Sequence, residues 1–307
     1  MSTSPLGLTP RTALLLVVPP LLWAGNAVVG RLVYPYVPPL TLNFLRWVGA
    51  FLLLLPLAHG LLRARSPLWS HWRRYALLAL LGVGCYNSFQ YLALHTSSPI
   101  NVTLVASSSP VFMLAIGALF FGQAIRSQQL WGAALSILGV LCVLSRGDPA
   151  TLLSVQWVVG DIYVLIATAC WSFYSWLLAQ PKDPPELRSN WAQFLMAQIF
   201  FGLGWSGLFS GLEWSLTPAH IEWNLTVVLA LIYVSIGPAI LAYRCWGLGV
   251  QQAGPNVAGF FANLTPLFAA TISTLMLGDS PAAYHVLAFA LIVGGIWVSS
   301  RRSKPQE

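Results

Sequence analysis

Long apolar segments, each about the length of a membrane-crossing helix, follow one another along the whole chain. An α-helix needs about 20 mostly apolar residues to cross the hydrocarbon core of a bilayer, which is roughly 30 Å thick. Ten segments meet this requirement: 12–33, 40–62, 75–94, 99–121, 129–145, 157–179, 191–210, 225–247, 255–277 and 281–300. The pattern predicts an all-α integral membrane protein with ten transmembrane helices.

The composition supports this interpretation and argues against a soluble protein. Apolar residue types make up 57% of the 307 residues and charged types only 7%, whereas soluble domains contain roughly 45–50% and about 25%. This is too little charge to cover a water-facing surface. The net charge of +7 does not indicate a nucleic-acid-binding protein, because the basic residues are scattered among apolar segments rather than gathered on one face.

The distribution of basic residues predicts the orientation of the helices. If both termini are cytoplasmic, the cytoplasmic connections and tails hold eleven of the fifteen Lys and Arg residues, and the outer connections hold only Arg146. Basic residues accumulate on the cytoplasmic side of membrane proteins. We therefore expect both termini in the cytoplasm, with 301–307 as a basic cytoplasmic tail.

Two halves of the chain share a pattern of prolines and glycines at an offset of 156 residues. The matching pairs are Pro99 and Pro255, Pro110 and Pro266, Gly122 and Gly278, and Gly139 and Gly295. The repeat divides the chain into a first unit, 1–145, and a second, 157–300, each with five predicted helices. Because five is odd, the second unit is expected to be an inverted copy of the first. Inverted copies favour an alternating-access carrier, with a channel or a membrane enzyme as the alternatives.

Several short stretches together resemble a known family. They are Trp23–Asn26 with Arg31 behind it, Leu45–Arg46, Pro99–Gly122 and Pro255–Gly278. In this order, and with five helices in each half, they resemble the EamA-type, ten-helix members of the drug/metabolite transporter superfamily. Within it the chain is most similar to bacterial exporters of aromatic amino acids. The resemblance implies a bacterial inner-membrane protein with a substrate cavity between its halves.

Polar and aromatic residues within the spans are the candidates for substrate binding, because a polar group in the bilayer is costly unless it faces a cavity or a partner. They are Trp23, Asn26, Tyr86, Asn87, Gln90, Ser107, Ser109, Trp171, Tyr174, Tyr243, Phe260 and Asn263. Amides and hydroxyls could bind the amino and carboxylate ends of a substrate while rings pack against its side chain. Alternatively, the polar residues bridge neighbouring helices.

Two prolines and three arginines could serve the transport cycle. Pro110 and Pro266 are predicted to bend their helices at matching depths, either as hinges or as static kinks. Arg31 and Arg46 lie near the outer ends of the first two predicted helices, and Arg244 lies near the inner end of the eighth. These arginines either extend to the membrane interface or act as gates that contact helix carbonyls or a substrate carboxylate.

Tryptophans near the predicted helix ends are expected to anchor the protein at the two membrane interfaces. They are Trp47, Trp69, Trp72, Trp131, Trp157, Trp191, Trp214 and Trp223.

Missing residue types narrow the function. No Asp or Glu lies deep within a predicted span, which disfavours export of bare cations and proton coupling through a carboxylate. The last two helices contain no Lys or Arg, which disfavours a phosphorylated substrate. The span interiors also lack a nucleophile with its base, and the four cysteines lack zinc-site spacing, so we expect no enzyme activity, cofactor or metal.

We therefore predict a carrier that exports small neutral or zwitterionic metabolites, preferentially amino acids with aromatic or large apolar side chains. Other small metabolites or drugs are the alternative substrates, and a channel is the alternative mechanism. The expected partners are a small-molecule substrate and the lipid bilayer, with no nucleic acid. The pattern is compatible with a monomer or a homodimer.

Overall fold

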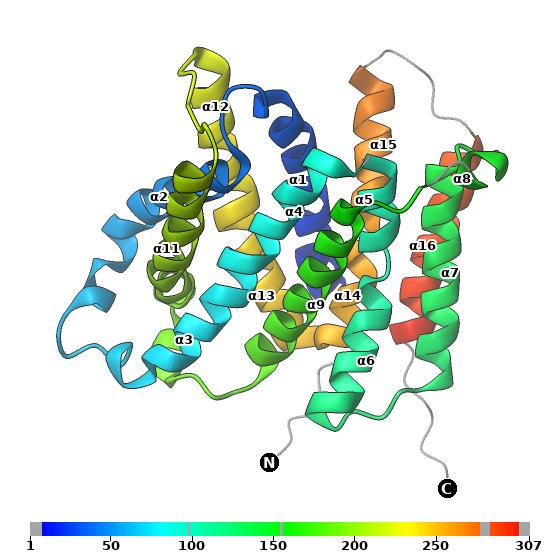
Figure 1. The fold of residues 1–307 in the computed structure, drawn as a ribbon. Coiled ribbons are helices and arrows are strands. Elements are labelled where there is room, and N and C mark those ends of the chain that lie inside the picture. Colours follow the sequence, from blue (N-terminus) through cyan, green and yellow to red (C-terminus); the bar gives the residue numbers. More distant parts are fainter. Residues whose placement is uncertain (1–7, 98, 154–155, 277–282, 301–307) are drawn as a thin grey trace, which may run out of the picture.

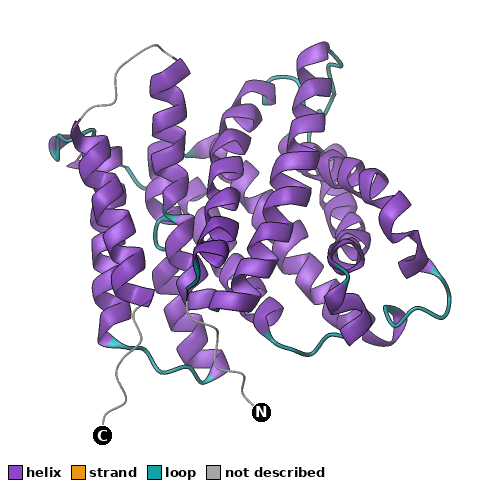
Figure 2. Ribbon diagram, turned by 180° about the vertical axis from the view of Figure 1, so that it is seen from behind, coloured by secondary structure: helices purple, strands orange, loops and turns teal. Residues whose placement is uncertain are grey.

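The chain folds as a bundle of helices (Figures 1 and 2). A computed structural model describes residues 8–97, 99–153, 156–276 and 283–300, and all the regular secondary structure in these ranges is helical. The α-helices are α1 (Pro10–Val33), α2 (Pro39–Ala58), α3 (Trp72–Ala79), α4 (Tyr86–Thr96), α5 (Pro99–Ala106), α6 (Ser109–Phe121), α7 (Ser127–Leu144), α8 (Ala150–Leu153), α9 (Val159–Ala179), α10 (Pro185–Ser189), α11 (Trp191–Leu216), α12 (Leu225–Val234), α13 (Ala242–Ala253), α14 (Pro255–Ala262), α15 (Leu264–Met276) and α16 (Ala283–Ser300). Short 3-10 helices, η1 (His59–Leu62) and η2 (Trp69–His71), and π-helical segments, η3 (Leu80–Cys85) and η4 (Ser235–Leu241), extend them.

Nine helical segments within the described ranges are long and apolar enough to cross a membrane. The predicted all-α membrane fold is thereby confirmed. The ninth predicted span, 255–277, is divided at Asn263 into α14 and α15, so neither piece alone reaches the length of a span. Its last residue, 277, and residues 281–282 of the final predicted span lie outside the described residues.

Local sequence signals set many of the helix ends. Asn190 begins α11 by accepting hydrogen bonds from the backbone of the first turn, and Asn224 does the same for α12. Such side chains satisfy N–H groups that have no partner within a helix. Glycines end α6 and α13, where Gly122 and Gly254 have φ of 64° and 86°, because this left-handed backbone is strained for other residues.

The predicted end of the seventh span, residue 210, is wrong, since α11 continues to Leu216. The extra turns carry Glu213, whose buried carboxylate accepts hydrogen bonds from the backbone N–H groups of Leu40 and Thr41, at 3.0 and 2.8 Å. An acidic residue is expected to end a membrane span, but this one caps the first turn of α2. The connection predicted over 211–224 is correspondingly shorter.

The helices are arranged with α2, α3 and α11 on one side of the bundle and the packed pair α7 and α16 on the other (Figure 1). Between them lie α1, α4, α9 and α13. The α7–α16 pair approaches closely because glycines face each other: a Cβ on Gly295 would lie 2.6 Å from the carbonyl oxygen of Gly132. Small residues allow this approach in membrane bundles.

Irregular helix segments recur at matching places in the two halves. The π-helical segment η4 begins 155 residues after η3. The break between α5 and α6 falls at Ser107–Ser108, and the break between α14 and α15 falls at Asn263, 156 residues after Ser107. These positions agree with the proline and glycine repeat of the sequence and support the interpretation of the halves as related units.

Candidate functional site

A cavity of about 150 Å³ lies between helices of both halves. Its wall comes from α1, α4, α5 and α6 of the first half and from α9, α14 and α15 of the second. The lining residues are Trp23, Asn26, Ala27, Tyr86, Asn87, Gln90, Tyr91, Leu94, Val102, Thr103, Ala106, Ser107, Ser109, Thr168, Trp171, Ala262, Asn263, Thr265 and Pro266. None of these described residues is acidic or basic.

Nine of the twelve predicted binding residues lie on this wall, and three do not. Those on the wall are Trp23, Asn26, Tyr86, Asn87, Gln90, Ser107, Ser109, Trp171 and Asn263. Tyr174, Tyr243 and Phe260 are buried outside it. Their position places them in the packing around the cavity, whereas substrate binding by the nine remains a prediction.

Tyr91 and Thr168 also line the cavity but are not among the predicted binding residues. Tyr91 follows Asn87 by four residues and Thr168 precedes Trp171 by three, so each shares a helix face with a residue that was predicted. Helical spacing around the predicted positions could therefore have identified both.

Aromatic rings form one end of the cavity. The Trp171 ring centroid lies 4.4 Å from that of Tyr86, 5.1 Å from that of Trp23 and 5.2 Å from that of Trp246. Tyr174 and Tyr243 continue the cluster at 5.0 and 5.4 Å from Trp171. These distances are typical of favourable ring pairs. The rings close the bundle on the side where α9 ends.

The cavity extends the other way, toward the turn between α4 and α5. Gln90 and Leu94 lie one and two helical turns beyond Asn87 along α4, and Val102 lies in the first turns of α5. The cavity is therefore displaced toward one end of the bundle. Packed rings separate it from the opposite end.

Asn87 connects the cavity wall to both halves of the chain. Its Nδ2 donates to the Gly82 carbonyl oxygen and to the Tyr243 hydroxyl, both at 2.9 Å. Its Oδ1 accepts from Arg46 Nη1 at 3.1 Å. Gly82 belongs to the π-helical segment η3, so these contacts fix the point at which that helix is irregular. Asn87 thus lines the cavity and bridges helices, and its role in substrate binding remains a prediction.

Arg46 is fully buried, so its predicted extension to the interface is wrong. It lies two helical turns inside α2 and finds partners in the bundle: Nη1 donates to Asn87 and, at 3.1 Å, to the Tyr91 hydroxyl. The neighbouring Trp47 is also fully buried and donates to Asn43 Oδ1 at 3.0 Å. Its predicted role as an interfacial anchor is wrong for the same reason.

The other two predicted gate arginines have exposed side chains. Arg31 lies in the last turn of α1. Arg244 places its guanidinium 4.1 Å from the ring centroid of Trp191. Both exposed positions are typical of arginines at the membrane interface, and a gating role for either remains a prediction.

The predicted hinge prolines follow complete breaks rather than bends within continuous helices. Pro110 lies in the first turn of α6, and Pro266 lies in the first turn of α15. Proline is tolerated there because the first N–H groups of a helix have no internal partner. The Ser107 hydroxyl donates to the Leu104 carbonyl at 2.6 Å, and Asn263 Nδ2 donates to Ser136 Oγ of α7 at 2.9 Å. The side chains at the two breaks are thus held by hydrogen bonds.

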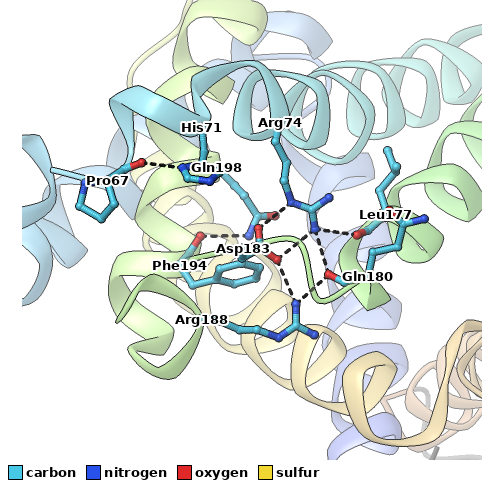
Figure 3. Close-up of polar contacts among 9 residues, drawn as sticks. All are labelled: Pro67, His71, Arg74, Leu177, Gln180, Asp183, Arg188, Phe194 and Gln198. Atoms are coloured by element: carbon cyan, nitrogen blue, oxygen red, sulfur yellow. Dashed lines mark hydrogen bonds and ion pairs between the residues drawn. The ribbon is translucent and has the colours of Figure 1, made fainter. Parts of the chain in front are cut away.

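A charged cluster joins α3 to the segment after α9 (Figure 3). Asp183, with a fully buried side chain, accepts from Arg74 at 2.7 and 3.0 Å and from Arg188 at 2.9 Å. Both arginines also donate to the Gln180 carbonyl. The cluster lies at the end of the bundle that the aromatic rings close.

The other buried carboxylates of the described chain are also held by hydrogen bonds. Asp161 accepts from the Ser97 hydroxyl and from the Val158 N–H at the start of α9, and Glu213 caps α2. In the ranges that the structure describes, no three His, Cys, Asp or Glu side chains come together to hold a metal ion.

Comparisons with known proteins agree with this arrangement. The chain matches the EamA-like transporter family twice, over residues 10–145 and 158–301. It is 27% identical over 292 residues to an uncharacterized transporter of Archaeoglobus fulgidus, covering 95% of this chain and 98% of the relative. It is 25% identical to the aromatic amino acid exporter YddG of Ancylobacter novellus, covering 86% and 88%. A solved crystal structure that is 21% identical superposes with a TM-score of 0.71 over 94% of this chain and 96% of that one.

Proposed function

Because the chain belongs to the EamA-like transporter family, we propose that it exports amino acids with aromatic or large apolar side chains by alternating access. Membership makes it a multi-pass membrane transporter of small molecules. The observation that carries the finer proposal is the cavity between the halves, which is lined by rings at one end and by amides and hydroxyls along its wall.

The size and lining of the cavity support an aromatic side chain. An engineered cavity of about 150 Å³ in a protein core holds benzene, and the cavity here has a comparable volume of about 150 Å³. Trp23, Tyr86 and Trp171 surround its closed end. A substrate ring in this place would make the ring contacts that stabilise aromatic clusters.

Backbone carbonyls offer acceptors for the substrate's ammonium group. Proline has no N–H, so Pro110 and Pro266 cannot donate to the carbonyls four residues earlier, those of Ala106 and Ala262. Both alanines line the cavity, one from each half. We infer that these carbonyls accept hydrogen bonds from the ammonium group.

The position of the cavity toward one end of the bundle fits one of the two conformations of an alternating-access cycle. With the orientation predicted from the basic residues, the α4–α5 end faces outward and the charged cluster around Asp183 lies on the cytoplasmic side. The described conformation is then open toward the outside and closed toward the cytoplasm. Exchange of the roles of the two halves would open the cavity inward.

Transport into liposomes containing the purified chain tests the proposal. We expect saturable uptake of tryptophan and phenylalanine, with counterflow driven by unlabelled substrate inside, and little uptake of threonine or a polyamine. Counterflow separates a carrier from a channel. A Trp171→Ala variant that remains monodisperse should lose this uptake. Equal uptake of all four compounds, or uptake without counterflow, would contradict the proposal.

A further inference from the structure

The cavity lies beside a buried positive charge that has no acidic partner among the described residues. The Arg46 side chain is fully buried, and the three ion pairs of the described chain involve other residues. Only Nη1 is hydrogen-bonded, whereas Nε and Nη2 have no partner. The guanidinium lies 5.1 Å from the Trp47 ring centroid, but a cation–π contact offsets only part of the cost of a buried charge without an acidic partner. Its presence next to a ligand-sized cavity therefore points to a ligand that carries the opposite charge.

Arg46 also determines which way the hydrogen bonds on the wall run. Arginine can only donate, so the Tyr91 hydroxyl oxygen accepts from it. The Tyr91 O–H in turn donates to Asn26 Oδ1 at 3.1 Å. The Asn26 carbonyl oxygen is thereby occupied, and its Nδ2 remains as a donor on the cavity wall. Through Tyr91, the guanidinium thus determines that the group Asn26 offers to the cavity is a hydrogen-bond donor.

A second buried donor without a partner belongs to a residue of the same wall. Trp171 Nε1 is buried and has no hydrogen-bond partner among the described residues, although Trp171 lines the cavity. Buried polar groups are nearly always hydrogen-bonded. Arg46 Nε and Nη2 and Trp171 Nε1 can only donate hydrogen bonds, so each of these unpartnered atoms calls for an acceptor.

We propose that this side of the cavity is a carboxylate-binding subsite, in which Asn26 and Trp171 bind the carboxylate and Arg46 supplies the compensating charge from behind. Arg46 acts through Tyr91 and Asn87, so it is a positioning residue. The subsite rests on the proposed function and adds the group that the substrate must carry. Among the described residues, no acidic side chain lines the cavity to attract an ammonium group, so the carboxylate contributes more to binding than the amine does.

Three ligands with the same ring separate the two charged groups. Phenylalanine carries both, 3-phenylpropionate lacks the amine, and phenylalaninol has a hydroxyl in place of the carboxylate. In calorimetric titrations of the purified protein, we expect 3-phenylpropionate to bind at least about tenfold more tightly than phenylalaninol, as expected from hydrogen bonds to a charged group. Equal affinities for the two would overturn the carboxylate subsite.

Variants assign the preference to Arg46. Arg46→Met should bring the two affinities within about threefold of each other, and Arg46→Lys, which keeps a positive charge, should restore part of the difference. Arg73→Met is the matched control, because Arg73 also lies over a tryptophan ring but is exposed at the start of α3. It should bind like the unmodified protein. A preference that survives in Arg46→Met would contradict the role of Arg46.

If Arg46→Met does not fold, as judged by size-exclusion chromatography and melting temperature, Trp171→Phe provides the second test. This variant keeps a ring but removes the Nε1 donor. It should weaken 3-phenylpropionate more than phenylalaninol, and an equal effect on both would contradict the subsite.

Phenylalanine counterflow in liposomes, measured alongside, distinguishes failure of the subsite from failure of the proposed function. Counterflow with equal binding of 3-phenylpropionate and phenylalaninol would refute only the subsite. Preferential carboxylate binding without counterflow would refute only the proposed amino-acid transport, and absence of binding by all three ligands would refute both.

Discussion

Replacing Asp183 by alanine should destabilise the closed end of the bundle. Asp183 receives three hydrogen bonds of 2.7–3.0 Å from Arg74 and Arg188, whose side chains are 14% and 23% exposed. Removing one member of a buried charge cluster costs about 3–5 kcal/mol. Because both arginines retain some contact with solvent, which screens their charges, we expect about 2–3 kcal/mol here.

This cost predicts a measurable local opening. If the cluster forms only while the cytoplasmic side is closed, about 2–3 kcal/mol corresponds to a shift of roughly 30- to 150-fold in the opening equilibrium. Hydrogen exchange of the amides of residues 180–190, in protein reconstituted into nanodiscs, should accelerate by this factor in Asp183→Ala. The matched control is Glu186→Ala, which removes an exposed carboxylate without an ion pair from the same segment. Unchanged protection in Asp183→Ala, or equal acceleration in both variants, would refute the interpretation of the cluster as a closing contact.

Two further substitutions test how irregular and polar elements hold the bundle together. Gly82→Ala should lower the melting temperature by several degrees, because a Cβ there would lie 2.8 Å from the buried Tyr174 ring and overpacking costs about 1–3 kcal/mol. Gly204→Ala is the control, since a Cβ there meets nothing within 4 Å, and it should leave the melting temperature unchanged. Equal melting temperatures of the two variants would contradict the tight packing of η3. Glu213→Gln should lower the stability by about 1 kcal/mol in the same thermal assay, since an amide replaces the carboxylate that caps α2; an unchanged melting temperature would show that the charge of the cap is unimportant.

The sequence predicted the membrane helices and much of the cavity wall because both follow from the cost of polar groups in lipid. A residue such as Asn87 in the middle of an apolar segment must face a cavity or a partner, and the structure shows that it does both. The repeated prolines likewise marked the places where α5 and α14 end. These features depend on composition and spacing along a single helix.

Other features depend on contacts that spacing does not reveal. Arg46 is near the start of its span, so its burial is explained only by its hydrogen bonds to Asn87 and Tyr91. Both partners are more than 40 residues away in the sequence. From the sequence, Glu213 is expected to end its membrane span, and its role as a cap is recognised only once the start of α2 is known to lie beside it. The π-helical segment η3 changes the rotation of the helix in the middle of a span, so the direction in which Tyr86 points cannot be extrapolated from the residues before it.

Filling the cavity is the most direct test of its role as the transport route. Ala106→Phe would place a ring in the cavity, whereas Ala134→Phe adds the same ring to an exposed position of α7. We would measure counterflow of labelled phenylalanine in liposomes holding equal amounts of each folded variant. We predict that Ala106→Phe reduces the rate to that of protein-free liposomes while Ala134→Phe transports like the unmodified chain. Full counterflow in Ala106→Phe would show that the substrate passes elsewhere.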